Sequence, residues 1–253
     1  MQAYGQSFAH VYNARWSGFA KRVAPLIYDF YVTTPVAQQS NSVLDLCCGA
    51  GHLALYFLEK GFKVVGLDLS LHMLACAKEN ARPYLESSQA RFEQGDASNF
   101  RLDERFGLVV STYDSLNHLK GETDLERCFQ CVRAVSDGYF IFDLNTRLGL
   151  RRWNSIQVDD SSESELIINR GIYDGQSDRA WTRITGFFRK SDGSYERFDE
   201  TAFNTVFELE RVKNRLLHVG WNNVYFARVE DLHNPLTAAQ AEKEPRAFVV
   251  ATA

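Results

Sequence analysis

The hydrophobic pattern changes along the chain and divides it into four segments. Residues 1–40 place aromatic and aliphatic side chains at three- to four-residue spacing, which is typical of helices. Residues 42–145 alternate short apolar runs with amphipathic stretches of helical period. Residues 146–207 are rich in β-forming side chains, and the pattern of residues 208–253 indicates one helix followed by two strands. We expect these segments to form one domain over residues 1–253.

Five short apolar runs in the second segment predict buried strands. They span residues 42–47, 62–70, 90–96, 106–114 and 138–145. Helical periodicity predicts helices between them at residues 52–61, 71–81 and 122–135. Strands that alternate with helices form right-handed βαβ units, so the sequence predicts an α/β fold with a mainly parallel sheet. Because the runs show no polar alternation, we expect helices on both faces of this sheet.

The third segment has the character of an antiparallel meander inserted after the fifth strand. Its β-rich stretches are residues 165–174, 179–190 and 195–207. Turn-like sequences separate them, among them SDG at 191–193. Partial alternation of polar and apolar residues indicates that one face of the meander covers another part of the protein. An amphipathic helix at 208–221 and strands at 223–232 and 246–253 then bring the predicted central sheet to seven strands.

Composition narrows the function classes. The 253 residues carry a formal net charge of −4, which argues against general affinity for nucleic-acid backbones, because that affinity requires clustered positive charge. No apolar stretch reaches the ~18–20 residues that cross a bilayer, and the first residues lack the apolar core of a signal peptide. Five cysteines, an odd number, fall largely in segments predicted to be buried, so we expect reduced thiols and a cytoplasmic protein.

A metal site is not expected. Cys128 and Cys131 form a CxxC pair on one face of the predicted helix 122–135. A metal would need further ligands at suitable spacing, and the other cysteines supply no second pair. The histidines show no HxxxH pattern. The pair is therefore predicted to be two small buried side chains.

Polar residues follow the first two strands at the edge where open α/β sheets bind ligands. Asp45 closes the first strand, and Gly49 and Gly51 allow the backbone of the next turn to approach a ligand closely. The following helix begins near His52, and its N-terminus favours an anionic group. Asp68 ends the second strand, 19 residues after Gly49, a spacing at which a carboxylate can accept hydrogen bonds from both ribose hydroxyls.

The next two strand ends continue this arrangement. Gly95, Asp96 and Ala97 follow the third strand, and residues 111–115 follow the fourth. The glycine turn alone also fits the dinucleotide pattern G-x-G-x-x-A, so an NAD(P)-dependent oxidoreductase is a competing enzyme class. Asp45, which precedes the turn, and Asp96, which follows the third strand, favour a cofactor other than NAD(P).

With these motifs in place, the chain resembles the class I S-adenosylmethionine (SAM)-dependent methyltransferases. VLDLCCGAG, GLDLSLHML, GDASNF and TYDSLNHL are similar to successive motifs of that family, although Cys47 stands where the family usually has glycine. Residues 43–145 carry the resemblance, and residues 208–253 share only the topology. The resemblance implies a Rossmann-like sheet with an antiparallel last strand. SFAHVYNARW is similar to the lid helices of methyltransferases for sugars and amino acids, which implies N-terminal lid helices and an acceptor site covered by the insertion.

The resemblance also implies residue roles. Asp68 would bind the ribose, Met73 would pack near the adenine, Asp96 would lie near the adenine amino group, and Ala97 would supply a backbone contact. The complete predicted cofactor site comprises Tyr12, Trp16, Asp45, Cys47, Gly49, Gly51, Asp68, Leu69, Met73, Gly95, Asp96, Ala97, Ser111 and Tyr113.

Two residues just past the fourth strand are candidates for catalysis. His118 or Asp114 could act as a general base or orient the acceptor, and histidine suits neutral pH. The predicted reaction moves a methyl group from SAM to an N or O atom of a small molecule and leaves S-adenosylhomocysteine (SAH). We expect no nucleic-acid or membrane partner and a monomer or homodimer. The alternatives are the oxidoreductase and a non-catalytic module that binds SAM.

Overall fold

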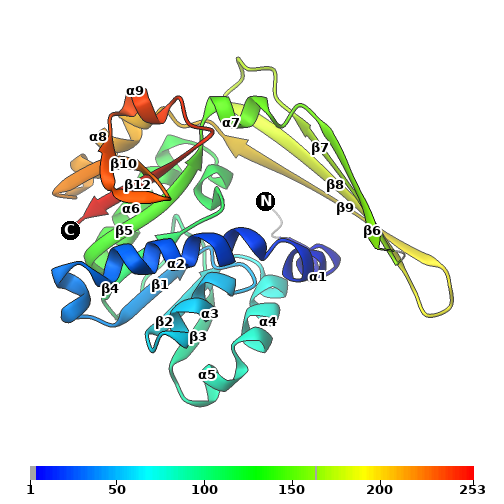
Figure 1. Cartoon of the computed structure of the whole chain (residues 1–253), viewed down its shortest axis with the longest axis horizontal. Helices are drawn as coiled ribbons and strands as arrows, with labels where there is room; N and C mark the ends of the chain where they lie inside the picture. Colours follow the sequence, from blue (N-terminus) through cyan, green and yellow to red (C-terminus); the bar gives the residue numbers. More distant parts are fainter. Residues whose placement is uncertain (1–3, 163) are drawn as a thin grey trace.

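The computed structural model describes residues 4–162 and 164–253 (Figure 1). Within this part, the central sheet has eight strands in the order β11-β10-β12-β5-β4-β1-β2-β3. The strands are β1 (Ser42–Leu46), β2 (Lys63–Asp68), β3 (Ala90–Gln94), β4 (Phe106–Ser111), β5 (Ser136–Asn145), β10 (Asn223–Arg228), β11 (Asp231–Leu236) and β12 (Arg246–Thr252). The first five are parallel, and β12 runs antiparallel to both β5 and β10. The predicted α/β fold with an antiparallel last strand is confirmed.

The prediction of seven strands was wrong by one, because residues 223–232 do not form a single strand. The chain turns at residues 229–230, and β11 returns antiparallel to β10 at the edge of the sheet. Val229 and Glu230 are not turn-forming residues, so the sequence carries no signal for this hairpin. A short helix that was also not predicted, α9 (Ala238–Ala241), precedes β12.

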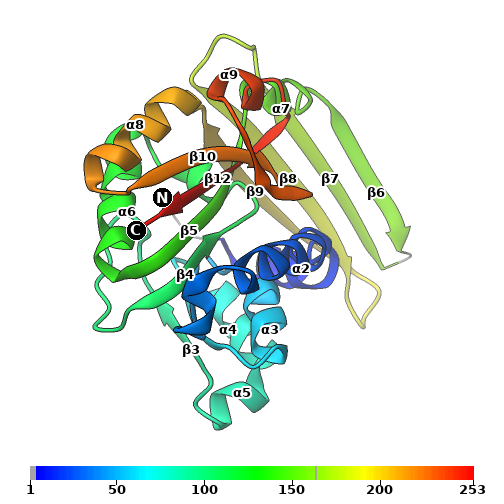
Figure 2. The same cartoon turned by 60° about the vertical axis from the view of Figure 1, so that its left-hand side comes forward.

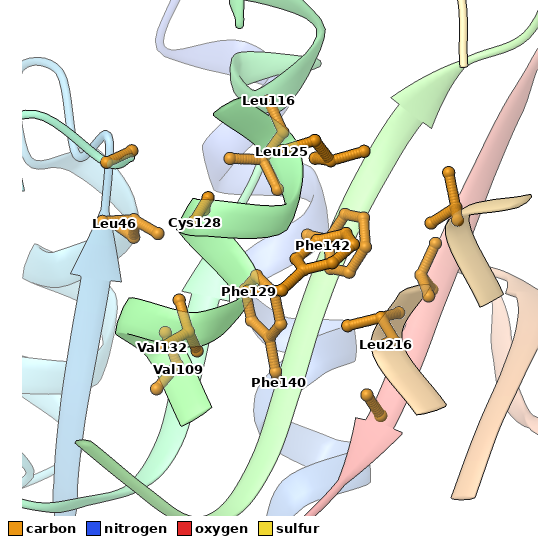
Figure 3. Packing of buried hydrophobic residues seen from close by; sticks show 14 of the residues in the cluster. Leu46, Val109, Leu116, Leu125, Cys128, Phe129, Val132, Phe140, Phe142 and Leu216 are labelled. Atoms are coloured by element: carbon orange, nitrogen blue, oxygen red, sulfur yellow. The ribbon is translucent and has the colours of Figure 1, made fainter. Parts of the chain in front are cut away.

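Helices cover both faces of the sheet, as the continuous apolar strands predicted. One face packs against α6 (Glu122–Val135) and α8 (Leu209–Val219), and the other against α2 (Gly18–Val32), α3 (His52–Glu59) and α4 (Leu71–Asn80). Alternate residues of β5 serve the two faces, with Phe140 and Phe142 on the first and Ile141 on the second. Figure 3 shows Phe129 of α6 against Phe140 and Phe142, with ring centroids 6.2 and 5.6 Å apart. The short helices η1 (Pro35–Gln38) and α5 (Arg82–Glu86) join these elements.

The insertion forms a separate antiparallel sheet that projects from the core (Figure 1). Among the described residues it has four strands, β6 (Ile156–Ser162), β7 (Glu165–Ile172), β8 (Arg179–Arg189) and β9 (Tyr195–Thr205), entered through α7 (Arg147–Arg151). The sequence predicted only the last three. β6 was missed because its sequence, IQVDDSS, is rich in aspartate and serine, which are uncommon in strands.

The first two helices have different roles, and this corrects the prediction that residues 1–40 form a lid as a whole. Helix α1 (Gln6–Arg15) lies between the core and the inserted sheet, where Phe8 and Val11 pack against Ile167 and Ile184. Helix α2 instead belongs to the core layer, because its buried residues pack with α3 (Figure 2). We refer to α1 below as the lid helix. Within the described residues, none of the helices combines the length and apolarity required to cross a bilayer.

Candidate functional site

The turn between β1 and α3 brings the backbone close to its neighbours. Gly49 has φ +54° and Gly51 has φ +75°, and a Cβ on Gly51 would lie 3.0 Å from the Cβ of Ala77. Glycine is therefore required at Gly51 both for its dihedrals and for the packing of α3 against α4. Cys47, which stands where the related motif has glycine, also has φ +60°. The turn keeps a glycine-like backbone there although it carries a side chain.

Asp68 connects the ends of the first two strands. One carboxylate oxygen accepts a hydrogen bond from the backbone N–H of Gly49 and the other from that of Ser70, each at 2.8 Å. Burial raises the pKa of this carboxyl, and the two amide hydrogen bonds partly offset that effect. A carboxylate has about four acceptor positions, so both oxygens can still accept hydrogen bonds from a ligand.

Asp45 lies deeper. Its carboxylate accepts a hydrogen bond from the backbone N–H of Ala54 at 3.1 Å, which fixes the start of α3. Burial raises the pKa of Asp45 to about 8, the Ala54 amide lowers it, and the charge of Asp68 adds to the increase. A carboxyl poised in this way would become fully charged if a cationic group bound beside it.

Four further residues predicted to bind the cofactor lie after β2, on α4 or after β3, and their environments differ. Asp96 is exposed and accepts hydrogen bonds from the backbone N–H and the hydroxyl of Ser98. Leu69 is 45% exposed and Ala97 is buried. Met73 is buried in the apolar cluster that contains Phe8 of the lid helix.

A small hollow lies above the glycine turn. It is lined by Tyr12, Trp16, Ala20, Asp45, Cys47, Cys48, Ala50, His52, Leu53, Thr112 and Tyr113. Its volume is about 20 Å³, room for about one water molecule. The ring centroid of Tyr12 lies 6.1 Å from that of Trp16 and 6.1 Å from that of Tyr113.

The chemistry of the hollow suits SAM. Nε2 of His52 is buried and has no hydrogen-bond partner within the described residues. Buried polar atoms in proteins are nearly always satisfied, so this nitrogen is available to a ligand. The site thus offers carboxylates for hydroxyl and ammonium groups, a free imidazole nitrogen, and a glycine turn for close approach.

The loop after β4 is held by two residues that the sequence did not indicate. Asp114 is buried and forms an ion pair with Arg246 at 2.8 Å. Arg246 also forms an ion pair with Asp143, which lies beside the same loop. Asp143 lies near the end of the fifth strand. The predicted site residues lie near the ends of the first four strands, so the position of Asp143 was a signal for it. Arg246 belongs to β12, and no local signal marks it.

His118 lies in η2 (Ser115–His118) and faces a residue that the sequence also missed. Its Nε2 is 3.4 Å from the hydroxyl of Tyr4. The backbone oxygen of Tyr4 accepts a hydrogen bond from Ser70, and the N–H of Gly5 donates to Glu200 of β9. The chain before the lid helix is thereby attached both to the cofactor edge of the core and to the inserted sheet.

The surroundings of Tyr4 are acidic. Burial is the main cause that raises the pKa of its hydroxyl, and the carboxylates of Asp114, Asp68 and Glu200 raise it further. The hydroxyl of Tyr4 therefore stays protonated at neutral pH. This end of the site favours positive charge over negative charge.

The prediction that both cysteines of the CxxC pair are buried is confirmed for Cys128 only. Cys128 is fully buried and Cys131 is half-buried on α6, and in the described residues all five cysteines are free thiols. The same residues contain no group of three or more histidine, cysteine or acidic side chains placed to hold a metal ion.

The chain is similar to known methyltransferases in sequence and in fold. Residues 43–137 match the methyltransferase domain family. A Bacillus subtilis (strain 168) protein assigned as a methyltransferase, YqeM, is 28% identical over 221 residues, which cover 85% of each chain. The dTDP-3-amino-3,4,6-trideoxy-alpha-D-glucopyranose N,N-dimethyltransferase of Streptomyces venezuelae is 30% identical over 123 residues, 48% of this chain and 49% of that protein. A solved SAM-dependent methyltransferase from Clostridium acetobutylicum ATCC 824 has the same fold, with a TM-score of 0.76, 23% identity and 97% of both chains covered.

Residues 43–137 thus carry a methyltransferase domain, and the chain has the fold of the solved SAM-dependent methyltransferase. The chain is therefore an enzyme, and its cofactor is SAM. The two competing predictions, an NAD(P)-dependent oxidoreductase and a non-catalytic module that binds SAM, are therefore set aside.

Proposed function

We propose that the enzyme transfers the methyl group of SAM to a nitrogen atom of a small-molecule amine. The observation that carries this proposal is the acidic surrounding of Tyr4, where Asp68, Asp114 and Glu200 all act on the hydroxyl. The name of the S. venezuelae relative, which methylates an amino group of a sugar nucleotide, supports it.

Charge movement favours nitrogen over oxygen. SAM supplies an electrophilic methyl group on a positively charged sulfur, and transfer to a neutral amine moves that charge onto nitrogen. Carboxylates fixed nearby stabilise the charge that develops there. The same carboxylates would disfavour an anionic oxygen nucleophile, because like charges repel. Glu200 therefore suits an amine acceptor.

His118 is proposed to receive or direct the proton of the amine. An amine is mostly protonated at neutral pH and must lose a proton before it can attack. His118 is half-buried, lies beside Tyr4, and has the side chain best suited to exchange protons near pH 7. Asp114 is held by Arg246, so we assign it to support of the loop.

The remaining predicted residues are proposed to bind the cofactor. Asp68 would accept the ribose hydroxyls, Asp45 the ammonium group, and Asp96 the adenine amino group. Tyr12 and Trp16 of the lid helix would close over the methionine end. The other proposed contacts are those predicted from the sequence, namely Cys47, Gly49, Gly51, Leu69, Met73, Gly95, Ala97, Ser111 and Tyr113.

The test is methyl transfer from labelled SAM to a panel of small molecules, with the product located by mass spectrometry. The panel pairs amino sugars, sugar nucleotides and amino acids with analogues that carry hydroxyl in place of amino. We expect methylation of amines only. Labelling of a hydroxyl analogue, or of RNA included as a further acceptor, would contradict the proposal.

The role of His118 is tested separately. His118→Asn should lower turnover while SAH affinity stays the same. His72→Asn is the matched control, because His72 lies exposed on α4. If both variants turn over at the rate of the unchanged enzyme, His118 is not the proton acceptor.

A further inference from the structure

The loop after β4 contains two successive residues in a disfavoured backbone conformation. Tyr113 has φ +67° and Asp114 has φ +50°, and neither is glycine. Side chains with a Cβ rarely adopt this left-handed region, so such a turn persists only where its surroundings hold it. Tyr113 also lines the hollow above the glycine turn. Its position therefore bears on the shape of the cofactor site.

Asp143 of β5 holds both residues through their backbones. One oxygen of its carboxylate accepts a hydrogen bond from the N–H of Tyr113 at 2.6 Å, and the other accepts from the N–H of Asp114 at 2.9 Å. Asp143 is fully buried. Two amides captured by one immobile carboxylate fix the orientation of the turn, because hydrogen bonds to a charged acceptor are short and directional.

Arg246 completes this arrangement from the neighbouring strand β12, which lies beside β5 (Figure 2). Its guanidinium pairs with the carboxylates of both Asp143 and Asp114. The planar, forked donor group of arginine can serve two acceptors at once, which a lysine cannot do in the same geometry. The turn is therefore held through its backbone by Asp143 and through its side chain by Arg246.

An aromatic contact joins this group to α2. The ring of Phe19 stacks on that of Tyr113, with centroids 4.6 Å apart and planes 11° from parallel. The Arg246 guanidinium lies 4.8 Å from the Phe19 centroid and 5.7 Å from that of Tyr113. Because the ring centroid of Tyr113 lies 6.1 Å from that of Tyr12, the contact extends to the lid-helix side of the pocket.

We propose that Arg246 is a positioning residue for cofactor binding, which acts through Asp143 and Asp114 to hold the Tyr113–Asp114 turn as a fixed wall of the pocket. The fixed wall gives the rings of Tyr12 and Trp16 a surface against which to close. Arg246 itself does not line the hollow. Its effect on SAM is thus indirect.

The test measures SAH binding by calorimetry, well below the melting temperature of each variant. Arg246→Lys keeps a cation without the fork, and Arg246→Gln removes the charge. We expect SAH affinity to fall about fivefold in the lysine variant and about 30-fold in the glutamine variant, because misplaced binding groups lose affinity steeply. The measurement needs no acceptor, so its result is independent of the proposed amine substrate.

Arg215 provides the matched control. It also bridges two carboxylates, those of Glu122 and Glu126, but on the face of the sheet covered by α6 and α8. Arg215→Lys and Arg215→Gln should lower thermal stability and leave SAH affinity unchanged. If the Arg246 variants likewise lose stability but bind SAH as the unchanged enzyme does, the role of Arg246 is purely structural and the proposal fails.

A second variant covers the case in which loss of Arg246 prevents folding. Phe19→Leu leaves the buried ion pairs intact and removes the ring that stacks on Tyr113. Phe19 is not among the residues that line the hollow. We expect SAH affinity to fall about threefold in this folded variant, since the wall is less well fixed. Unchanged affinity there would overturn the proposal.

Discussion

The side-chain amide of Asn117 donates a hydrogen bond to the backbone oxygen of Thr205, with 2.9 Å between the two atoms. Asn117 belongs to η2 in the core, and Thr205 ends β9 of the inserted sheet. The amide oxygen of Asn117 accepts from the N–H of Asn145, where the chain leaves the core, and the Thr205 hydroxyl donates to the oxygen of Leu119. Both ends of the insertion are therefore attached to the segment that carries His118.

Removal of the Asn117 side chain should weaken this attachment. Asn117 is fully buried, so Asn117→Ala would leave the N–H of Asn145 and the oxygen of Thr205 without their partner. We expect a loss of about 2–4 kcal/mol in the free energy of unfolding, measured in urea. SAH affinity should stay within about twofold, because Asn117 does not line the cofactor hollow. Asn222→Ala, at an exposed position, is the control, and an equal loss in both would refute the assignment.

Asp68→Asn tests the predicted ribose site. The amide keeps the size of the side chain but replaces one acceptor oxygen with a donor, which would face the N–H of either Gly49 or Ser70. We expect SAH affinity to fall about 100-fold, since a charge-assisted hydrogen bond is lost and a local clash of donors is created. Calorimetry measures the change, with exposed Asp103→Asn as control. Equal affinity in the two variants would remove Asp68 from the cofactor site.

The parts of the fold that the sequence predicted well are those with local signals. The helix predicted at residues 122–135 has those bounds as α6, because its apolar residues keep a helical period and Glu122 and Asp124 favour its first turn. The strands predicted at 42–47 and 62–70 end within two residues of the observed ends of β1 and β2, because Asp45 and Asp68 mark the polar edge of the sheet.

The parts that could not be predicted depend on contacts distant in sequence. Arg246 reaches Asp114 only because β12 inserts between β10 and β5, an order that no local pattern specifies. Tyr4 reaches His118 because the lid helix lies against the inserted sheet. The left-handed turn at Tyr113 was invisible for the same reason, since Asp143 holds it from another strand.

Asp45→Asn should separate stability from binding through pH. The folded-state pKa of about 8 lies above the ordinary value of 3.8, so the folded chain retains a proton that the unfolded chain releases. Asp45 therefore destabilises the fold increasingly as pH rises through this interval. The asparagine variant avoids this loss, so above about pH 8 its free energy of unfolding should be higher by about 1 kcal/mol or more. That difference corresponds to a melting temperature at least about 2–4 °C above that of the unchanged enzyme. Near pH 4 the two proteins should melt at the same temperature.

The same variant should bind SAH less tightly. A neutral amide cannot form the ion pair that we propose between the Asp45 carboxylate and the ammonium group of the cofactor. Calorimetry at neutral pH gives the affinity, and scanning calorimetry across pH gives the melting temperatures. If the melting temperatures of the variant and the unchanged enzyme differ by the same amount at every pH, Asp45 is not held protonated by burial.

Cys47 offers a chemical test of where the cofactor lies. The thiol lines the hollow beside Tyr12 and Trp16 and is half-buried. Burial, followed by the charge of Asp68, raises its pKa, so little thiolate forms at neutral pH and alkylation by iodoacetamide should be slow. Saturating SAH should slow labelling of Cys47 at least about tenfold, because a bound ligand suppresses access to its site.

Cys131 on α6, on the opposite face of the sheet from α3, serves as the internal control and should react at the same rate with and without SAH. Peptide mass spectrometry gives both rates in one sample, and equal protection of the two cysteines would mean that SAH alters the whole fold instead of covering Cys47.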